Sequence, residues 1–312
     1  MSRDLYWKLS VVAISLAMFS PARADDKSYQ LVYRFQSGQF FHYESDDKAE
    51  VLTQNANATD KEGRPLQSKS VQQTQLRKSF RVVAINENGN AVLEPIVEKV
   101  RMASQSGESV VISYDSTKGD APPKEFEKIA GTIGRALARF EVAPNGKLLK
   151  VKLLVDDVPK NFSDAAERAD PTINFLVVFP ESPVKIGGQW SEKYDVPVSV
   201  GNGLTQQIKF IRTYELTKVV DTVVSIRFRT SLLTPTNHTE ILRQLLQLTP
   251  TGTLDFDLQQ GRMLKRTLHI DDKVVGAFGP QTLLQARGES VEQLLNPAAM
   301  NASNTTPAQQ LK

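Results

Sequence analysis

The sequence predicts an α+β protein that is mainly antiparallel β: a large curved sheet or half-barrel with a few helices covering one face. Apolar and polar residues alternate with a period of two along most of the chain, which is typical of half-buried strands. Turns rich in Asn and Gly separate these runs. A helical period occurs only in short stretches near 122–137 and 163–179. Sheets of many strands curl, and helices can cover their apolar side.

The first 24 residues have the three parts of an export signal. Arg3 and Lys8 supply positive charge, 9–19 is an almost unbroken apolar run, and Ala22-Arg23-Ala24 is a small-x-small cleavage site. The run has 11 residues, whereas a membrane helix needs about 20. We therefore expect an exported chain, periplasmic or extracellular, with no transmembrane segment after cleavage. The alternative is a buried helix at the start of the domain.

Charge and cysteine content exclude several classes of function. The leader holds three of the 38 Lys and Arg residues and one of the 35 Asp and Glu residues, so the mature charge is +1. A near-neutral chain argues against a nucleic-acid partner. The absence of cysteine excludes disulfides, thiolate catalysis, cysteine-bound metal and a lipidated cysteine after the leader. An exported chain without disulfides needs a large core of its own.

The alternation begins with a predicted strand at 29–35 and a returning strand that contains Phe41 and Tyr43. Residues 46–66 are polar and predict a loop, although 49–54 could extend a strand. A clear hairpin follows, in which Asn86–Gly89 provides the turn between 80–85 and a return strand over 92–102. Pro95 cannot donate a ladder hydrogen bond, so we expect an edge or a bulge there. Residues 109–114 predict a further strand.

The period changes over 120–137 and predicts a helix. Phe126, Ile129, Ile133 and Leu137 recur at intervals of three, four and four residues, which is one helical face. The two glycines within this stretch, Gly131 and Gly134, suggest either close packing on a sheet or a movable lid. A second hairpin over 140–154 has its turn at 143–146, and 163–169 predicts a short helix. Asp170-Pro171 can start another helix, and 175–179 could alternatively be a buried strand.

The stretch from Phe179 to Trp190 contains two prolines and two adjacent glycines, which interrupt helix and strand alike. We interpret 180–190 as the joint between two β-rich halves of one domain over 25–296, with Trp190 opening the first strand of the second half. Alternation then resumes through 224–229, 254–258 and 263–270, while 240–248 could be helix or strand. The composition of 297–312 predicts a disordered tail.

The chain is poor in catalytic signatures. His42, His238 and His269 do not have metal-ligand spacing, and no Gly-x-Ser-x-Gly elbow occurs. The adjacent acidic pairs do not fit a calcium loop, and the double glycines do not fit a phosphate loop. We therefore expect no catalytic residues, no metal and no cofactor. A hydrolase with a site assembled from distant His, Asp and Ser residues is the less favoured alternative.

Two stretches carry a family resemblance. Pro180–Trp190 resembles a Pro-x-x-Pro-Val-x-x-Gly-x-x-Trp segment of uncharacterised exported bacterial β-rich proteins. Residues 252–257, followed by Gly261-Arg262, resemble a strand-turn-strand signature of the same group. Together they cover less than a tenth of the chain. The resemblance implies export from a bacterial cytoplasm and supplies no catalytic residues.

These observations predict a non-catalytic envelope protein that binds an apolar ligand, such as a lipid, or a protein partner. A structural or assembly module of the cell envelope is the alternative. We expect the ligand to contact apolar residues of the predicted helices and of the joint: Phe126, Ile129, Ile133, Phe175, Phe179 and Trp190. The same side chains would also serve as ordinary core.

Overall fold

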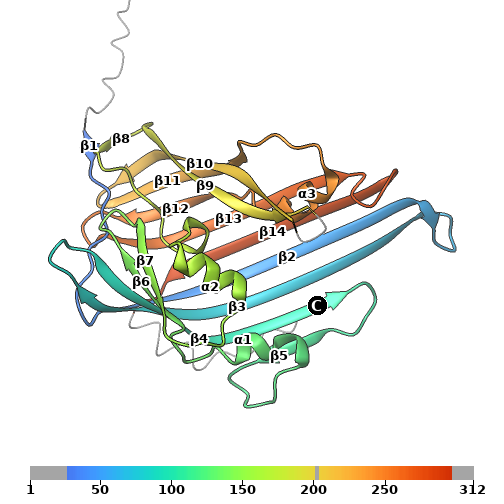
Figure 1. Cartoon of the computed structure of the whole chain (residues 1–312), viewed down its shortest axis with the longest axis horizontal. Coiled ribbons are helices and arrows are strands. Elements are labelled where there is room, and N and C mark those ends of the chain that lie inside the picture. Colours follow the sequence, from blue (N-terminus) through green and yellow to red (C-terminus); the bar gives the residue numbers. More distant parts are fainter. Residues whose placement is uncertain (1–26, 201–203, 297–312) are drawn as a thin grey trace, which may run out of the picture.

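Twelve strands form one antiparallel sheet in the described part of the chain, residues 27–200 and 204–296 of a computed structural model (Figure 1). The fold is therefore mainly antiparallel β with a few short helices, which confirms the predicted class. The expectations for the leader and the tail fall outside the described residues.

One side of the sheet comes from the first half of the chain. Its strands are β2 (Phe40–Thr59), β3 (Pro65–Ile85), β4 (Ala91–Ser106), β5 (Ile112–Asp115), β6 (Ala138–Val142) and β7 (Leu148–Leu153). The two predicted hairpins are confirmed as β3–β4 and β6–β7. Pro95 lies where β4 pairs with β3 on one side only, between the segments that pair with β6 and β5, and register shifts occur nearby.

The other side comes from the second half. Its strands are β9 (Gln189–Ser199), β10 (Thr205–Val220), β11 (Val223–Leu232), β12 (Thr251–Asp257), β13 (Arg262–Val275) and β14 (Thr282–Leu294). Each pairs with the next along the chain, and Trp190 lies in the first of them, as predicted. The two sides join where β14 pairs with β2, from Thr282 opposite Asn55 to Leu294 opposite Tyr43. A separate pair joins β1 (Ser28–Tyr29) to β8 (Val184–Lys185).

The helices are short. They are η1 (Lys124–Phe126), α1 (Glu127–Ala130), α2 (Lys160–Glu167), η2 (Pro171–Ile173) and α3 (Thr239–Leu245). Phe162 of α2 packs on the β3–β4–β6 core, and Ile241 of α3 packs on β10. We call the face that α2 and α3 cover the inner face. Asp170 caps η2 by accepting from the Thr172 N–H at 2.9 Å, as its position suggested.

A continuous helix over 120–137 is wrong. Only η1 and α1 form, and the chain then turns back against β4. Gly134 adopts φ +75° and its N–H donates to the Val97 carbonyl at 2.8 Å, while Ile133 bridges to Val97. Contacts with the strand edge thus replace the helical hydrogen bonds. The undecided stretch 240–248 is the helix α3 and its C-terminal continuation.

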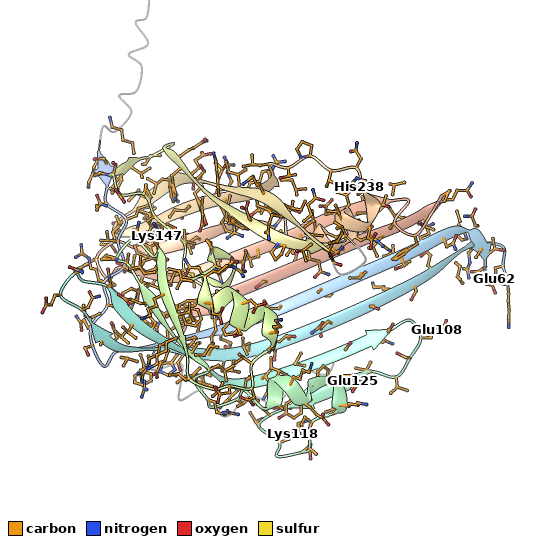
Figure 2. The ribbon with its side chains drawn as sticks, in the orientation of Figure 1. Glu62, Glu108, Lys118, Glu125, Lys147 and His238 are labelled. Carbon is orange, nitrogen blue, oxygen red and sulfur yellow. The ribbon has the colours of Figure 1, made fainter. Side chains whose placement is uncertain are left out.

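The loop predicted over 46–66 is also wrong, because β2 runs to Thr59 and β3 begins at Pro65, and the alternative of a strand extended over 49–54 is confirmed. These strand ends extend away from α2, and Glu62 marks the tip of their hairpin (Figure 2). Side chains of 46–59 are at least partly exposed, so both faces tolerate polar residues and the apolar alternation is weak; Val51, which packs on the cluster that contains Leu246, is an exception.

The strand predicted over 29–35 is reduced to Ser28–Tyr29. Leu31 and Tyr33 are buried as their alternation indicates, but the segment does not join the large sheet. The Tyr33 N–H donates to the Pro144 carbonyl, and the Arg34 N–H donates to the Gly261 carbonyl. An extended segment therefore crosses between two hairpin turns and satisfies its backbone there.

Candidate functional site

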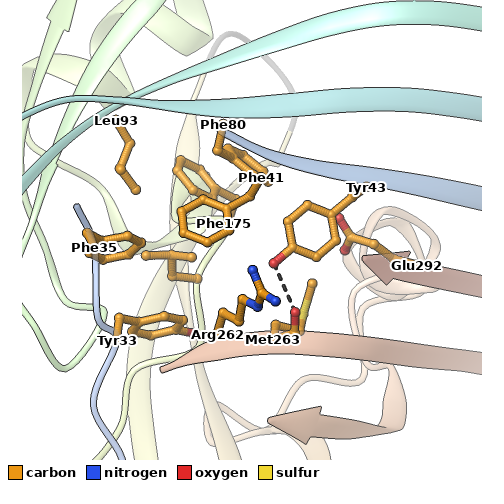
Figure 3. A pocket seen from close by; sticks show the side chains of 11 residues that line it. Tyr33, Phe35, Phe41, Tyr43, Phe80, Leu93, Phe175, Arg262, Met263 and Glu292 are labelled. Atoms are coloured by element: carbon orange, nitrogen blue, oxygen red, sulfur yellow. Dashed lines mark hydrogen bonds between the residues drawn. The ribbon is translucent and has the colours of Figure 1, made fainter. Parts of the chain in front are cut away.

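A cavity lies on the inner face, and the residues that connect η2 to β8 form part of its wall; Figure 3 shows its lining side chains. Aromatic rings form most of its wall: Tyr33, Phe35, Phe41, Tyr43, Phe80 and Phe175. The space that admits a water-sized molecule is about 30 Å³, and the whole atom-free space, including its mouth, is about 450 Å³. The interior as it stands thus holds roughly two waters, since one water needs about 10–15 Å³ on this measure.

Residues 174–183, which we call the cover segment, form part of the wall of the cavity. The Phe175 ring stacks on Phe80 at a centroid distance of 4.5 Å and meets Phe140 edge-on at 5.2 Å. Leu176 also lines the cavity. The cover segment has no regular secondary structure, so side-chain packing and local hydrogen bonds hold it in place.

The turn between β6 and β7 anchors the cover segment. The Asn174 amide donates to the Gly146 carbonyl at 2.9 Å, and the Phe179 N–H donates to the Asn145 carbonyl at 2.8 Å. The Tyr33 hydroxyl both donates to the Val177 carbonyl and accepts from the Val177 N–H. Burial raises the pKa of Tyr33, so its hydroxyl stays protonated and keeps donating.

One end of the cavity is charged. The Glu292 carboxylate lies 2.6 Å from Lys78 Nζ and 2.5 Å from Arg266 Nη2, and only 3 % of the residue is exposed. Burial alone would raise the pKa of Glu292, but the charges of Arg266 and Lys78 outweigh burial and lower it. The Tyr43 hydroxyl next to this group donates to the Met263 carbonyl at 3.0 Å. Burial, followed by the Glu292 charge, raises the pKa of Tyr43.

Arg262 also lines the charged end, and its guanidinium points into the cavity beside Tyr43 (Figure 3). The Nε atoms of Arg262 and Arg266 are both buried and have no hydrogen-bond partner within the described ranges. A buried donor without a partner is costly and therefore unusual.

The structure separates the six predicted contact residues into two groups. Phe175 lines the cavity, and Phe179 lies behind it, with its ring centroid 5.1 Å from Tyr33. Trp190 meets Phe179 at 6.4 Å and donates from its indole to the Val178 carbonyl. The remaining three, Phe126, Ile129 and Ile133, belong to the segment beside β4 and do not line this cavity.

Sequence reasoning missed the charged end. Lys78 and Glu292 lie on the same face of their strands as the inward-facing Phe80 and Ala286, so each places a charge on an apolar face. That pattern was visible in the sequence. The sequence did not show that β14 pairs with β2, which brings Glu292 close to Lys78.

Two further polar groups lie outside the cavity. His42 Nδ1 is 2.8 Å from Glu98, and Ser79 lies opposite His42 on the neighbouring strand. Ser79 is 2 % exposed, so a substrate carbonyl cannot reach it in this arrangement. On β9, Glu192 lies 3.4 Å from the Tyr214 hydroxyl, and burial raises its pKa although Arg212 and this hydrogen bond oppose the shift.

The described part of the chain has neither a cluster of metal ligands nor a membrane-spanning helix. Within residues 27–200 and 204–296, no three acidic or histidine side chains gather in a way that could hold a metal ion. None of the helices described there has the length and apolar character needed to cross a membrane.

Comparisons with known proteins find no matching family model and no matching curated protein. A solved structure of lipid–protein interactions in lipovitellin aligns with 89 % of this chain and 27 % of its own, at 11 % identity and a TM-score of 0.40. The Salmonella SPI-1 type III secretion injectisome secretin InvG, in its open gate state, aligns with 85 % of this chain and 64 % of its own, at 10 % identity and a TM-score of 0.15. The chain thus spans about a quarter of the lipovitellin chain. Both TM-scores are below 0.5, and neither likeness supports an argument about function.

Proposed function

We propose that this protein binds an apolar ligand on the inner face of its sheet, in the cavity that Phe175 closes, and does not act through catalysis. The observation that carries the proposal is an aromatic-lined cavity whose cover is a segment without regular secondary structure. Ligand sites are typically concave, mostly apolar, and furnished with a few polar groups.

A ligand chain enters by taking the place of the Phe175 ring. The backbone on either side of the ring stays anchored, through Asn174 on one side and Val177 on the other. Exposing the ring costs about 1.5–3 kcal/mol, and each buried methylene returns about 0.8 kcal/mol. Roughly four methylenes therefore offset the displacement, and a longer hydrocarbon chain gives net binding.

Export is part of the same proposal. The leader over 1–24 and the resemblance to exported bacterial β-rich proteins support a periplasmic or extracellular location, where a carrier would meet lipids or other apolar molecules. A test is the cellular fraction in which the mature chain accumulates when it is expressed with and without residues 1–24.

Native mass spectrometry and calorimetric titration with dodecanol test ligand binding. We expect the wild-type mature chain to bind dodecanol, and Phe175→Ala to bind it several-fold more tightly because the ring no longer competes for the space. Leu149→Ala, at a 40 % exposed residue of β7, is the control and should leave binding unchanged. Failure of both the wild type and Phe175→Ala to bind dodecanol would overturn the proposal.

A second candidate, docking of a protein partner, is favoured by the edge strand β9. Its 11 residues pair only with β10 among the described strands, and unpaired strand edges are templates for strand addition. A photo-crosslinking residue at Lys193 on this edge should capture one dominant protein in cells, whereas one at Lys265, in the middle of the sheet, should not. Equal capture from both positions would count against docking.

A further inference from the structure

We infer that the ligand of this cavity is a hydrocarbon chain that ends in an anionic oxygen group, such as a carboxylate, and that Arg262 binds this group. The inference rests on the proposed function, since it concerns the chemistry of the ligand held in the same cavity. At the charged end, the apolar wall of the cavity meets charged side chains, and an uncharged lipid would have no group to pair with them.

The balance of charge at this end is positive. Three cations, Lys78, Arg262 and Arg266, line the cavity or contact its one carboxylate, Glu292. Glu292 is fully engaged, because Oε1 faces Lys78 and Oε2 faces Arg266. A largely buried group with an excess of positive charge is stabilised when an anion joins it.

Arg262 is the cation that remains available. Its Nε is buried without a hydrogen-bond acceptor, and no ion pair joins it to a carboxylate in the part of the chain described above. Its guanidinium points into the cavity, where the rings of Tyr43 and Phe41 lie on one side and Tyr33 on the other (Figure 3). Water could satisfy this donor in the free protein, and an anionic ligand would replace that water.

A guanidinium suits this task because its planar fork of donors matches a carboxylate or a phosphate with two parallel hydrogen bonds. The surrounding rings keep solvent away and strengthen the charge interaction. A ligand lying with its chain on Phe80, in the space that the Phe175 ring leaves, and its head at Arg262 would satisfy both ends of the cavity.

The experiment compares three probes of one chain length, lauric acid, dodecyl phosphate and dodecanol, by calorimetric titration of the mature chain. Lauric acid should bind about tenfold or more tightly than dodecanol, because a charge-assisted hydrogen bond is added. The phosphate probe identifies the preferred head: tighter binding than lauric acid assigns a phosphate, and weaker binding assigns a carboxylate.

Variants then test the role of Arg262. Arg262→Met should lower the affinity for lauric acid until the two probes, lauric acid and dodecanol, bind equally. Arg262→Lys, which keeps the charge, should retain part of the preference, and near-UV circular dichroism checks that both variants fold. Arg227→Met, at an exposed residue of β11, is the matched control.

The outcomes separate the inference from the proposed function. Equal binding of all three probes to the wild type would overturn the anionic head and leave apolar binding intact. Binding of none would overturn both. Equal loss of lauric acid and dodecanol in Arg262→Met and Arg262→Lys would show that Arg262 only supports the wall of the cavity.

Discussion

Phe175 stacks on Phe80 of β3, while Phe179, four residues further along, packs edge-on against Phe256 of β12 at 4.8 Å. Between Phe175 and Phe179, the cover segment therefore contacts strands from both halves of the sheet. Its aromatic side chains connect the core of the first half to that of the second, and the cavity lies at their meeting point.

Phe175→Ala should destabilise the fold by about 2–3 kcal/mol, less than the roughly 3–5 kcal/mol of a fully buried Phe, because this ring is only partly buried. Chemical denaturation measures the loss. Leu149→Ala, as control, should change the free energy of unfolding by about 0.5 kcal/mol or less. A variant that loses stability but gains affinity for dodecanol identifies Phe175 as a cover rather than ordinary core; a parallel loss of both would identify it as core.

Glu292→Gln should destabilise the protein by about 2–3 kcal/mol near neutral pH, since it leaves Lys78 and Arg266 without their buried partner. This is below the value of about 3–5 kcal/mol for full burial, because both cations are partly exposed. Glu289→Gln, at an exposed carboxylate of the same strand, should have almost no effect.

The effect of Glu292→Gln should also depend on pH. The pKa of Glu292 in the folded protein lies below its ordinary value of 4.5, so its stabilisation is complete above pH 4.5 and disappears as the pH falls through the folded-state pKa. Denaturation curves recorded at successive pH values should show the wild type and the variant converging below pH 4.5. A difference that stays constant on acidification would contradict this assignment.

Glu192→Gln should change the dependence of stability on pH in the opposite direction. Burial raises the pKa of Glu192, so the folded state holds its proton more tightly and loses stability as the pH rises from 4.5 through the raised value. The variant does not titrate, and an amide oxygen can still accept from the Tyr214 hydroxyl. We expect the variant to gain stability relative to the wild type as the pH rises through this window; a pH-independent difference would contradict the prediction.

Gly146→Ala should lower the free energy of unfolding by more than about 3 kcal/mol. Both Gly146 and Gly134 adopt a positive φ, which costs an alanine roughly 1–2 kcal/mol. A Cβ on Gly146 would also lie 2.3 Å from the Val177 carbonyl oxygen and 2.6 Å from the Tyr33 ring, whereas a Cβ on Gly134 would meet nothing within 4 Å. Gly134→Ala is therefore the matched control. Thermal unfolding measures the stability of both variants, and equal losses of stability would show that the cover segment moves aside without cost.

The parts of the fold that sequence predicted well are those governed by local chemistry. Asn86–Gly89 and Asn145-Gly146 are turns because the two glycines adopt a positive φ and the Asn86 and Asn145 side chains accept from backbone N–H groups of the turn, and the flanking strands followed from them. The spacing of apolar residues over 126–137 predicted a helix wrongly, because this segment packs against the edge of β4 instead of forming one helical face. The polar strand end over 46–59 gave only a weak strand signal, at 49–54, because its side chains are at least partly exposed.

The candidate site was predictable only in part. Phe175 was identified from its apolar surroundings, but the cavity depends on Tyr43, Arg262 and Glu292, which come from three strands of different halves. No local pattern brings these residues together. Their meeting depends on the register of β14 against both β2 and β13.

The pairing of β14 with β2 also sets the order of events during synthesis. Residues 40–59 emerge early, yet one long edge of that strand has no neighbour until residues 282–294 have been made. Ribosomal elongation proceeds at about 5–20 residues per second, so this edge stays open for many seconds, and open edges invite aggregation. The nascent chain should consequently depend on a chaperone that shields it until its last strand arrives, and contacts so distant along the chain should make its spontaneous refolding slow.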